Sequence, residues 1–306
     1  MKKVQFNNTT LKMSGLLYLP DNFDDNAKYP AIVCVHPGGG VKEQTSGLYA
    51  EKLAAQGFVA LAYDASHQGE SEGEPRLLED PTARVEDIRC AVDYLTTLPY
   101  VDRERIGAMG ICAGAGYSIA ATQTERRIKA VAGVSTVDIG AVFRETWNRN
   151  VGVDGQIKLL EDVAAQRTAE ANGEKPLLVH YVPEADEINE TTHPDMVEAH
   201  ELYRTPRGRH PNSVNWFLFT SNDKVIAFDG FAQVGTYLTQ PVLLIVGERA
   251  GSLHHSEKVY SLAPGEKEIF TINGASHIDL YDKPEYTSQA AAKLGAFFKQ
   301  HLGGRA

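Results

Sequence analysis

Residues 106–121 read IGAMGICAGAGYSIAA, which is an apolar run, a glycine-rich turn and a second apolar run. The first run is typical of a buried strand and the second of a helix, so Gly110-Ile111-Cys112-Ala113-Gly114 spans a strand-turn-helix junction. A G-x-nucleophile-x-G turn is so tight that side chains two residues from its centre would collide with neighbouring backbone, which explains both glycines. The pattern predicts that Cys112 is a nucleophile displayed above the carboxyl ends of the strands.

The expected chemistry of Cys112 depends on its position at a helix start. A thiol there faces the positive end of the helix dipole, which predicts a lowered pKa and more of the reactive thiolate. The alternative is a small buried hydrophobe. Cys34 and Cys90 fall inside a strand and a helix and are expected to be structural. Three cysteines without CxxC spacing give little support to a disulfide scaffold or a zinc knuckle.

Short apolar runs alternate with helix-length amphipathic segments on both sides of this turn. The alternation predicts a parallel sheet with crossover helices, preceded by an antiparallel hairpin. The expected strands are 31–36, 58–63, 106–111, 128–134, 242–246 and 268–272, the hairpin strands are 3–7 and 11–19, and the expected helices are 47–56, 83–98 and 286–301.

The alternation stops between about residues 139 and 235, where charged amphipathic segments such as 156–171 and 193–203 predict a helical cap insertion. The predicted core is therefore 1–138 and 236–306, and the predicted cap is 139–235. Five aromatic residues lie late in the cap. They could face an apolar pocket or anchor the cap to the core, and the sequence leaves both interpretations open. These residues are Trp216, Phe217, Phe219, Phe228 and Phe231.

Two glycine-containing loops supply the other groups that acyl chemistry needs. The first, residues 36–40 (HPGGG), follows a strand and can present N–H groups to a developing oxyanion, although an ordinary turn would look the same. Proline has no N–H, so Gly38 is the expected donor, with Ala113 as the second. The second loop follows the last strand and ends at His277, the expected general base. His254 and His255 are its competitors.

The acid that would orient the base is less clearly marked. Glu248 is the nearest carboxylate after the strand 242–246, Asp138 and Glu257 are alternatives, and Glu248 could instead form a surface ion pair. A metal site at His254, His255 and Glu257 lacks the spacing of a histidine zinc motif, so no metal is expected.

Composition excludes several other classes of protein. The 306 residues, 42% of them hydrophobic, describe a globular chain. A net charge of -10, from 30 basic and 40 acidic residues with no long basic run, argues against nucleic-acid binding. No apolar run reaches membrane-spanning length and no signal-peptide pattern follows the first lysines, so we expect a cytoplasmic protein without membrane association.

Taken together, these residues resemble the α/β-hydrolase superfamily, and the cysteine in G-x-C-x-G is similar to that of the dienelactone hydrolase branch. The stretches 40–45 (GVKEQT), 64–76 (DASHQGESEGEPR) and 274–282 (GASHIDLYD) resemble a subgroup of bacterial hydrolases related to fungal polyketide thiohydrolases and acyltransferases. The resemblance covers the core and implies an eight-stranded, mostly parallel sheet, a Cys-His-acid triad and no cofactor. Dienelactone hydrolases proper lack such a cap and carry aspartate where this chain has Glu248.

The sequence therefore predicts an α/β fold of the α/β-hydrolase type with a helical cap. Its predicted function is cofactor-independent hydrolysis of an ester, thioester or lactone through a covalent acyl-enzyme on Cys112, with His277 as base, Glu248 as acid and Gly38 and Ala113 as oxyanion donors. Acyl transfer on a polyketide-like thioester and non-catalytic binding of a small ligand are the alternatives. The expected partner is a small-molecule acyl substrate, and a homodimer is compatible with the sequence.

Overall fold

Eight strands form one sheet in the computed structural model, which describes residues 1–303. Their order is β1-β2-β4-β3-β5-β6-β9-β10, and the strands from β4 to β10 run parallel, while β1 and β2 are antiparallel to their neighbours. This confirms the predicted eight-stranded, mostly parallel sheet with its leading hairpin. The strands are β1 (Lys2–Asn8), β2 (Leu11–Tyr18), β3 (Tyr29–Val35), β4 (Val59–Tyr63), β5 (Val101–Ile111), β6 (Ile128–Val134), β9 (Val242–Gly247) and β10 (Lys267–Ile272).

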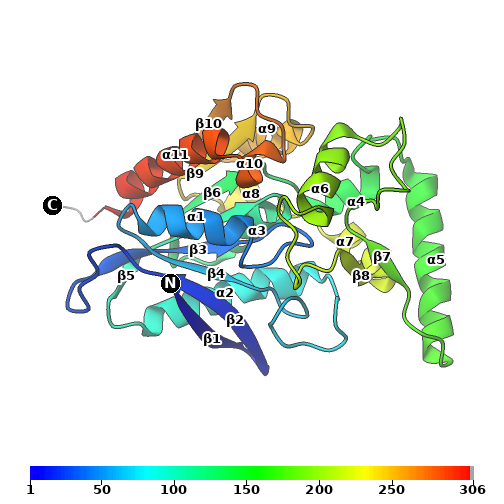
Figure 1. The fold of residues 1–306 in the computed structure, drawn as a ribbon, viewed down its shortest axis with the longest axis horizontal. Coiled ribbons are helices and arrows are strands. Elements are labelled where there is room, and N and C mark those ends of the chain that lie inside the picture. Colours follow the sequence, from blue (N-terminus) through cyan, green and yellow to red (C-terminus); the bar gives the residue numbers. More distant parts are fainter. Residues whose placement is uncertain (304–306) are drawn as a thin grey trace.

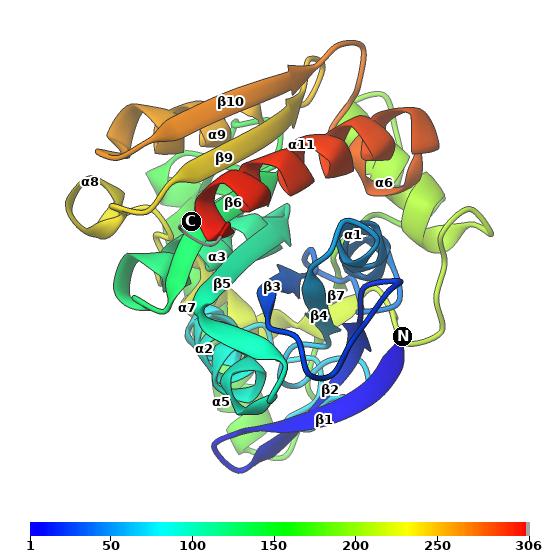
Figure 2. The same ribbon diagram turned by 90° about the vertical axis from the view of Figure 1, so that its left-hand side faces the viewer.

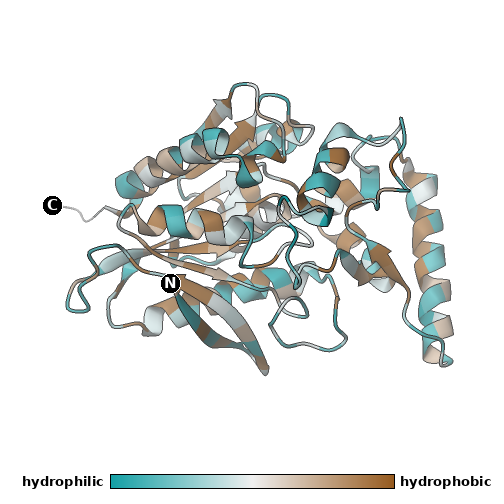
Figure 3. Cartoon of the chain, viewed as in Figure 1, coloured by the Kyte–Doolittle hydropathy of each residue, from teal (hydrophilic) through white to brown (hydrophobic). Residues whose placement is uncertain are grey.

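Helices cover both faces of this sheet (Figure 2). Alternate residues of β3 point to opposite faces: Val33 packs in the cluster that includes α2 (Pro81–Thr97) and α3 (Ala113–Thr124), and Ile32 in the cluster that includes α1 (Thr45–Ala54) and α11 (Pro284–Leu302). α9 (Leu253–Leu262) joins the first cluster. Because both faces are covered, the central strands contain continuous buried apolar runs, such as residues 31–35 of β3 and 106–111 of β5, and brown stretches mark apolar residues in Figure 3.

Most of the segment between β6 and β9 lies to one side of the sheet, next to the turn that follows β5 (Figure 1), whereas its last helix, α8 (Val234–Tyr237), packs against α3 and α9. It contains five helices, one short 3-10 helix and two short strands that pair antiparallel, with Val179 opposite Phe217. These elements are α4 (Ile139–Glu145), α5 (Val153–Ala171), β7 (Leu178–His180), α6 (Pro194–Arg204), β8 (Trp216–Leu218), η1 (Phe219–Ser221), α7 (Asn222–Ala227) and α8 (Val234–Tyr237). The sequence predicted only helices here, because strands of three residues are too short to show an alternating pattern.

Two local features of the fold position residues of the candidate site. β5 ends at Ile111 and α3 begins at Ala113, so a single residue, Cys112, connects the central strand to its helix. After β10 the chain passes through a loop to the short helix α10 (Asp279–Asp282) before α11 begins. No helix within residues 1–303 is long and apolar enough to cross a membrane.

Candidate active site

The turn after β5 has the strained geometry of a nucleophile elbow. Cys112 has φ +54° and ψ -122°, a region that a residue with a side chain seldom adopts. A Cβ atom on Gly110 would lie 2.1 Å from the carbonyl oxygen of Gly114, and one on Gly114 would lie 2.4 Å from that of Val35. Both glycines are therefore required by contact with backbone, as the sequence predicted.

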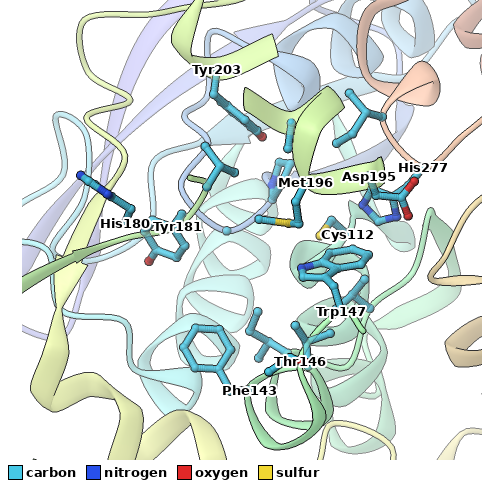
Figure 4. Close-up of a pocket in the computed structure, with 18 of the residues that line it drawn as sticks. Cys112, Phe143, Thr146, Trp147, His180, Tyr181, Asp195, Met196, Tyr203 and His277 are labelled. Carbon is cyan, nitrogen blue, oxygen red and sulfur yellow. The ribbon is translucent and has the colours of Figure 1, made fainter. Parts of the chain in front are cut away.

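Cys112 lines a cavity of about 320 Å³ between the sheet and the segment 139–235 (Figure 4). Most of the wall is apolar or aromatic and comes from that segment. Of the five aromatic residues singled out in the sequence, only Phe217 lines this cavity, whereas Phe231 is buried in the core and Phe228 packs against Tyr117. The apolar and aromatic lining residues from the segment are Ile139, Val142, Phe143, Trp147, Tyr181, Val182, Met196, Ala199, Tyr203 and Phe217.

His277 lines the same cavity and is fully engaged by hydrogen bonds. Its Nδ1 lies 2.6 Å from Oγ of Ser252, and its Nε2 lies 3.0 Å from the hydroxyl of Tyr281. The ring of Trp147 packs edge-on at 5.1 Å between centroids. Burial, with a smaller contribution from His193, lowers the pKa of His277 to about 3, so the imidazole is neutral near pH 7.

The thiol of Cys112 is also uncharged at rest, which corrects the expectation of a lowered pKa. Burial raises the pKa of Cys112 to about 11, although hydrogen bonds from the hydroxyl of Tyr281 and the N–H of Ala113 favour the thiolate. Desolvation by the apolar wall outweighs the helix dipole that the sequence argument relied on. The site therefore rests as a neutral thiol beside a neutral imidazole.

The predicted oxyanion donors lie beside the thiol. Ala113 is the first residue of α3, and Gly38 is close enough that a Cβ placed on it would be 4.0 Å from the Ala113 side chain. Within residues 1–303, the N–H of Gly38 donates no hydrogen bond to the protein. The loop is held by buried His36, whose Nε2 accepts from the N–H of Ala65 at 3.1 Å.

The buried carboxylate of Glu79 holds Tyr181, whose ring packs against this loop. Glu79 accepts hydrogen bonds from the hydroxyls of Tyr181 and Tyr117, each at 2.6 Å, and from Nε2 of Gln68 at 2.6 Å. The ring of Tyr181, from the segment beyond β7, lies against Gly38, 3.5 Å from a Cβ placed there. The Glu79 contacts therefore join the core to the wall of the cavity at the oxyanion loop.

The structure does not bring Glu248 to His277, so the predicted acid needs correction. Glu248 is exposed, and its Oε2 accepts from the N–H of Gly274 at 2.8 Å. The side chain braces the loop that carries His277 and does not contact the imidazole, because it points outward from the end of β9 toward solvent. Neither alternative replaces it: Asp138 caps α4 through the N–H of Gly140, and Glu257 is exposed on α9.

Two acidic residues of α6 reach the loops around the base. Oδ2 of Asp195 accepts from the N–H of Gly251 at 2.8 Å, beside Ser252, and Glu198 contacts Oγ of Ser276. Asp195 lines the cavity close to His277 in Figure 4, and burial raises the pKa of its carboxyl. α6 therefore helps to hold the loops that present His277.

Sequence reasoning missed three residues of this site: Ser252, Asp195 and Tyr281. The sequence could have indicated Tyr281, because this residue follows His277 by four positions, about one helical turn, within the stretch 274–282 that resembles the family. Ser252 and Asp195 carried none, because their contacts join segments far apart in the chain. Within residues 1–303 no group of three or more histidine, cysteine or acidic side chains is placed to hold a metal ion.

The sheet, the elbow and the capped cavity define an enzyme of the α/β-hydrolase type. The chain belongs to the dienelactone hydrolase family, whose model matches residues 13–201. It is 44% identical to the uncharacterized protein YcjY of Escherichia coli over 98% of this chain and 99% of that protein. The crystal structure of the hypothetical protein PA2218 from Pseudomonas aeruginosa superposes with a TM-score of 0.90 at 37% identity, covering 98% of this chain and 93% of that one.

One fungal relative is named for a reaction. The thiohydrolase aneE of Aspergillus aculeatus is 34% identical over 55% of this chain and 51% of its own length.

Proposed function

We propose that this enzyme hydrolyses an ester, thioester or lactone through a covalent acyl-enzyme on Cys112, without a cofactor. The observation that carries the proposal is the position of Cys112 at positive φ on the elbow, in the wall of the same cavity as His277. Nucleophilic catalysis needs such a side chain within reach of a base and of oxyanion donors. The fungal thiohydrolase supports the same class of substrate.

The reaction would proceed in two steps. Sulfur of Cys112 attacks the substrate carbonyl as the thiol proton passes to Nε2 of His277, and the N–H groups of Gly38 and Ala113 stabilise the oxyanion. The intermediate collapses, the leaving group departs with a proton from the imidazolium, and a thioester on Cys112 remains. Water, deprotonated by His277, then releases the acid. Ser252 in place of a carboxylate holds the imidazole in its reactive orientation.

The cavity favours an uncharged, hydrophobic acyl group. Its volume of about 320 Å³ is at the small end of the range for ligand pockets, roughly 300–1,000 Å³. Of the residues that line it, Asp195 is the only acidic one and there is no lysine or arginine. A small anionic lactone would find no cation to pair with there, so we expect medium-length acyl or aryl esters and thioesters to be better substrates.

A substrate panel tests the proposal. Nitrophenyl esters of increasing chain length, acyl thioesters and lactones are assayed with the wild type and with Cys112→Ala. We expect turnover of activated esters and thioesters that falls to background in the variant, and undiminished turnover in Cys112→Ala would refute the assignment. Adding alcohol acceptors separates hydrolysis from acyl transfer, because a transferase would yield the new ester in preference to the acid. A binding protein would bind the substrates without turnover.

A further inference from the structure

The hydroxyl of Tyr281 lies between the two groups that must exchange a proton. It is 3.0 Å from Nε2 of His277, and Tyr281 lines the same cavity as Cys112, whose pKa the phenol hydroxyl lowers. Tyr281 is 2% exposed, so no bulk water competes for this position. Within residues 1–303, the Nε2 hydrogen bond of His277 goes to Tyr281 and not to the sulfur of Cys112.

A general base needs an Nε2 that can take up a proton, and this requirement assigns the hydrogens of the row. In that tautomer Nδ1–H of His277 donates to Oγ of Ser252, and Nε2 accepts from the hydroxyl of Tyr281. The phenol oxygen is then free to accept a hydrogen bond from the thiol of Cys112. The row therefore runs from Cys112 through Tyr281 and His277 to Ser252, with each donor facing an acceptor.

We propose that Tyr281 is a further catalytic residue, whose hydroxyl carries the thiol proton from Cys112 to His277; this rests on the proposed function. The S–H proton moves to the phenol oxygen as the phenol proton moves to Nε2, so the phenol stays neutral throughout. The products are a thiolate, which attacks the carbonyl, and an imidazolium. Tyr281 then donates to the thiolate and accepts from the imidazolium, so it stabilises both new charges.

The position of Tyr281 is fixed by packing independent of this row. Its ring meets that of Tyr203 edge-on at 6.5 Å between centroids, and the hydroxyl of Tyr49 donates to the carbonyl of the preceding residue, Leu280, at 2.8 Å. The phenol is therefore held in place without its hydroxyl. Replacing it by phenylalanine removes one oxygen atom and leaves the fold and the ring contacts in place.

The comparison of Tyr281→Phe with Tyr63→Phe tests the proposal. Tyr63, the last residue of β4, is buried and packs against Phe6, and it neither lines the cavity nor contacts the row. Burst kinetics with a nitrophenyl ester give the acylation rate, alkylation by iodoacetamide at pH 7 reports thiol deprotonation, and thermal unfolding monitors folding. We expect Tyr281→Phe to slow acylation about 100-fold or more with little change in KM, and to slow alkylation, whereas Tyr63→Phe acylates as the wild type does.

A second substitution keeps the hydroxyl and changes only its acidity. We expect 3-fluorotyrosine at position 281 to retain acylation and to move its pH profile toward acid. Acylation and alkylation at wild-type rates in a folded Tyr281→Phe variant, with Cys112→Ala inactive, would overturn the relay and leave the proposed function intact. Activity retained by Cys112→Ala would instead overturn the proposed function itself.

Discussion

Acid should destabilise this protein through His277. The imidazole is buried and neutral in the folded state, with its pKa lowered to about 3, whereas an unfolded chain protonates it near pH 6.5. The stabilising contribution is therefore complete above about pH 6.5 and is lost as the pH falls toward 3. From these two pKa values, protonation of this one residue lowers the free energy of unfolding by about 2 kcal/mol between pH 7 and pH 5.

Urea unfolding at pH 7 and pH 5, for the wild type and His277→Gln, measures this contribution. The wild type should lose about 2 kcal/mol more than the variant over that interval, because glutamine does not titrate. His255→Gln should behave in the same way, since burial also lowers the pKa of His255 to about 3. If the wild type and both variants lose stability in parallel, His277 does not rest as the neutral base that the mechanism needs.

Three further changes test separate parts of the site. Gly114→Ala places a Cβ 2.4 Å from a main-chain carbonyl oxygen and should cost about 3 kcal/mol or more in urea unfolding; near-wild-type stability would show that the elbow is less tight. Ser252→Ala removes the Nδ1 partner of His277 and should lower kcat roughly tenfold or more, well beyond the effect of Glu248→Gln; the reverse order would restore Glu248 as the acid. Phe143→Ala enlarges the cavity and should raise kcat/KM for long over short acyl esters roughly tenfold, whereas an unchanged ratio would place the acyl group elsewhere.

The sequence predicted the core of the fold because the signals there are local. The strand Ile128–Val134 matches its expected bounds, β5 begins five residues earlier than expected, and the other expected strands and helices of the core differ by one or two residues at their ends. The core helix α9 was not predicted. The alternation of apolar strands with amphipathic helices predicts a parallel sheet from local patterns alone, so no distant contact has to be known. The sequence did not predict the pair β7 and β8, because the two strands are short and pair across 35 or more residues of chain, so no local pattern indicates them.

Backbone turns place the proposed nucleophile and oxyanion donors, whereas the contacts around the base arise where side chains meet across the chain. The turn at Cys112 could be predicted because its steric cause is local: a Cβ on Gly110 would lie 2.1 Å from the carbonyl oxygen of Gly114. Glu248 was assigned from its place after a strand, but the direction of a side chain is set by its neighbours, and this one turns to the N–H of Gly274. The raised pKa of the thiol depends on burial by the segment 139–235, which no local pattern reveals.

Mass spectrometry of a rapidly quenched reaction tests the central claim most directly. The enzyme is mixed with a slowly deacylating nitrophenyl ester, quenched in acid and digested. We expect a mass increase equal to one acyl group on the peptide that contains Cys112, sensitive to hydroxylamine and absent from Cys112→Ala. Turnover with no adduct at Cys112, or with the acyl group on another residue, would contradict the account.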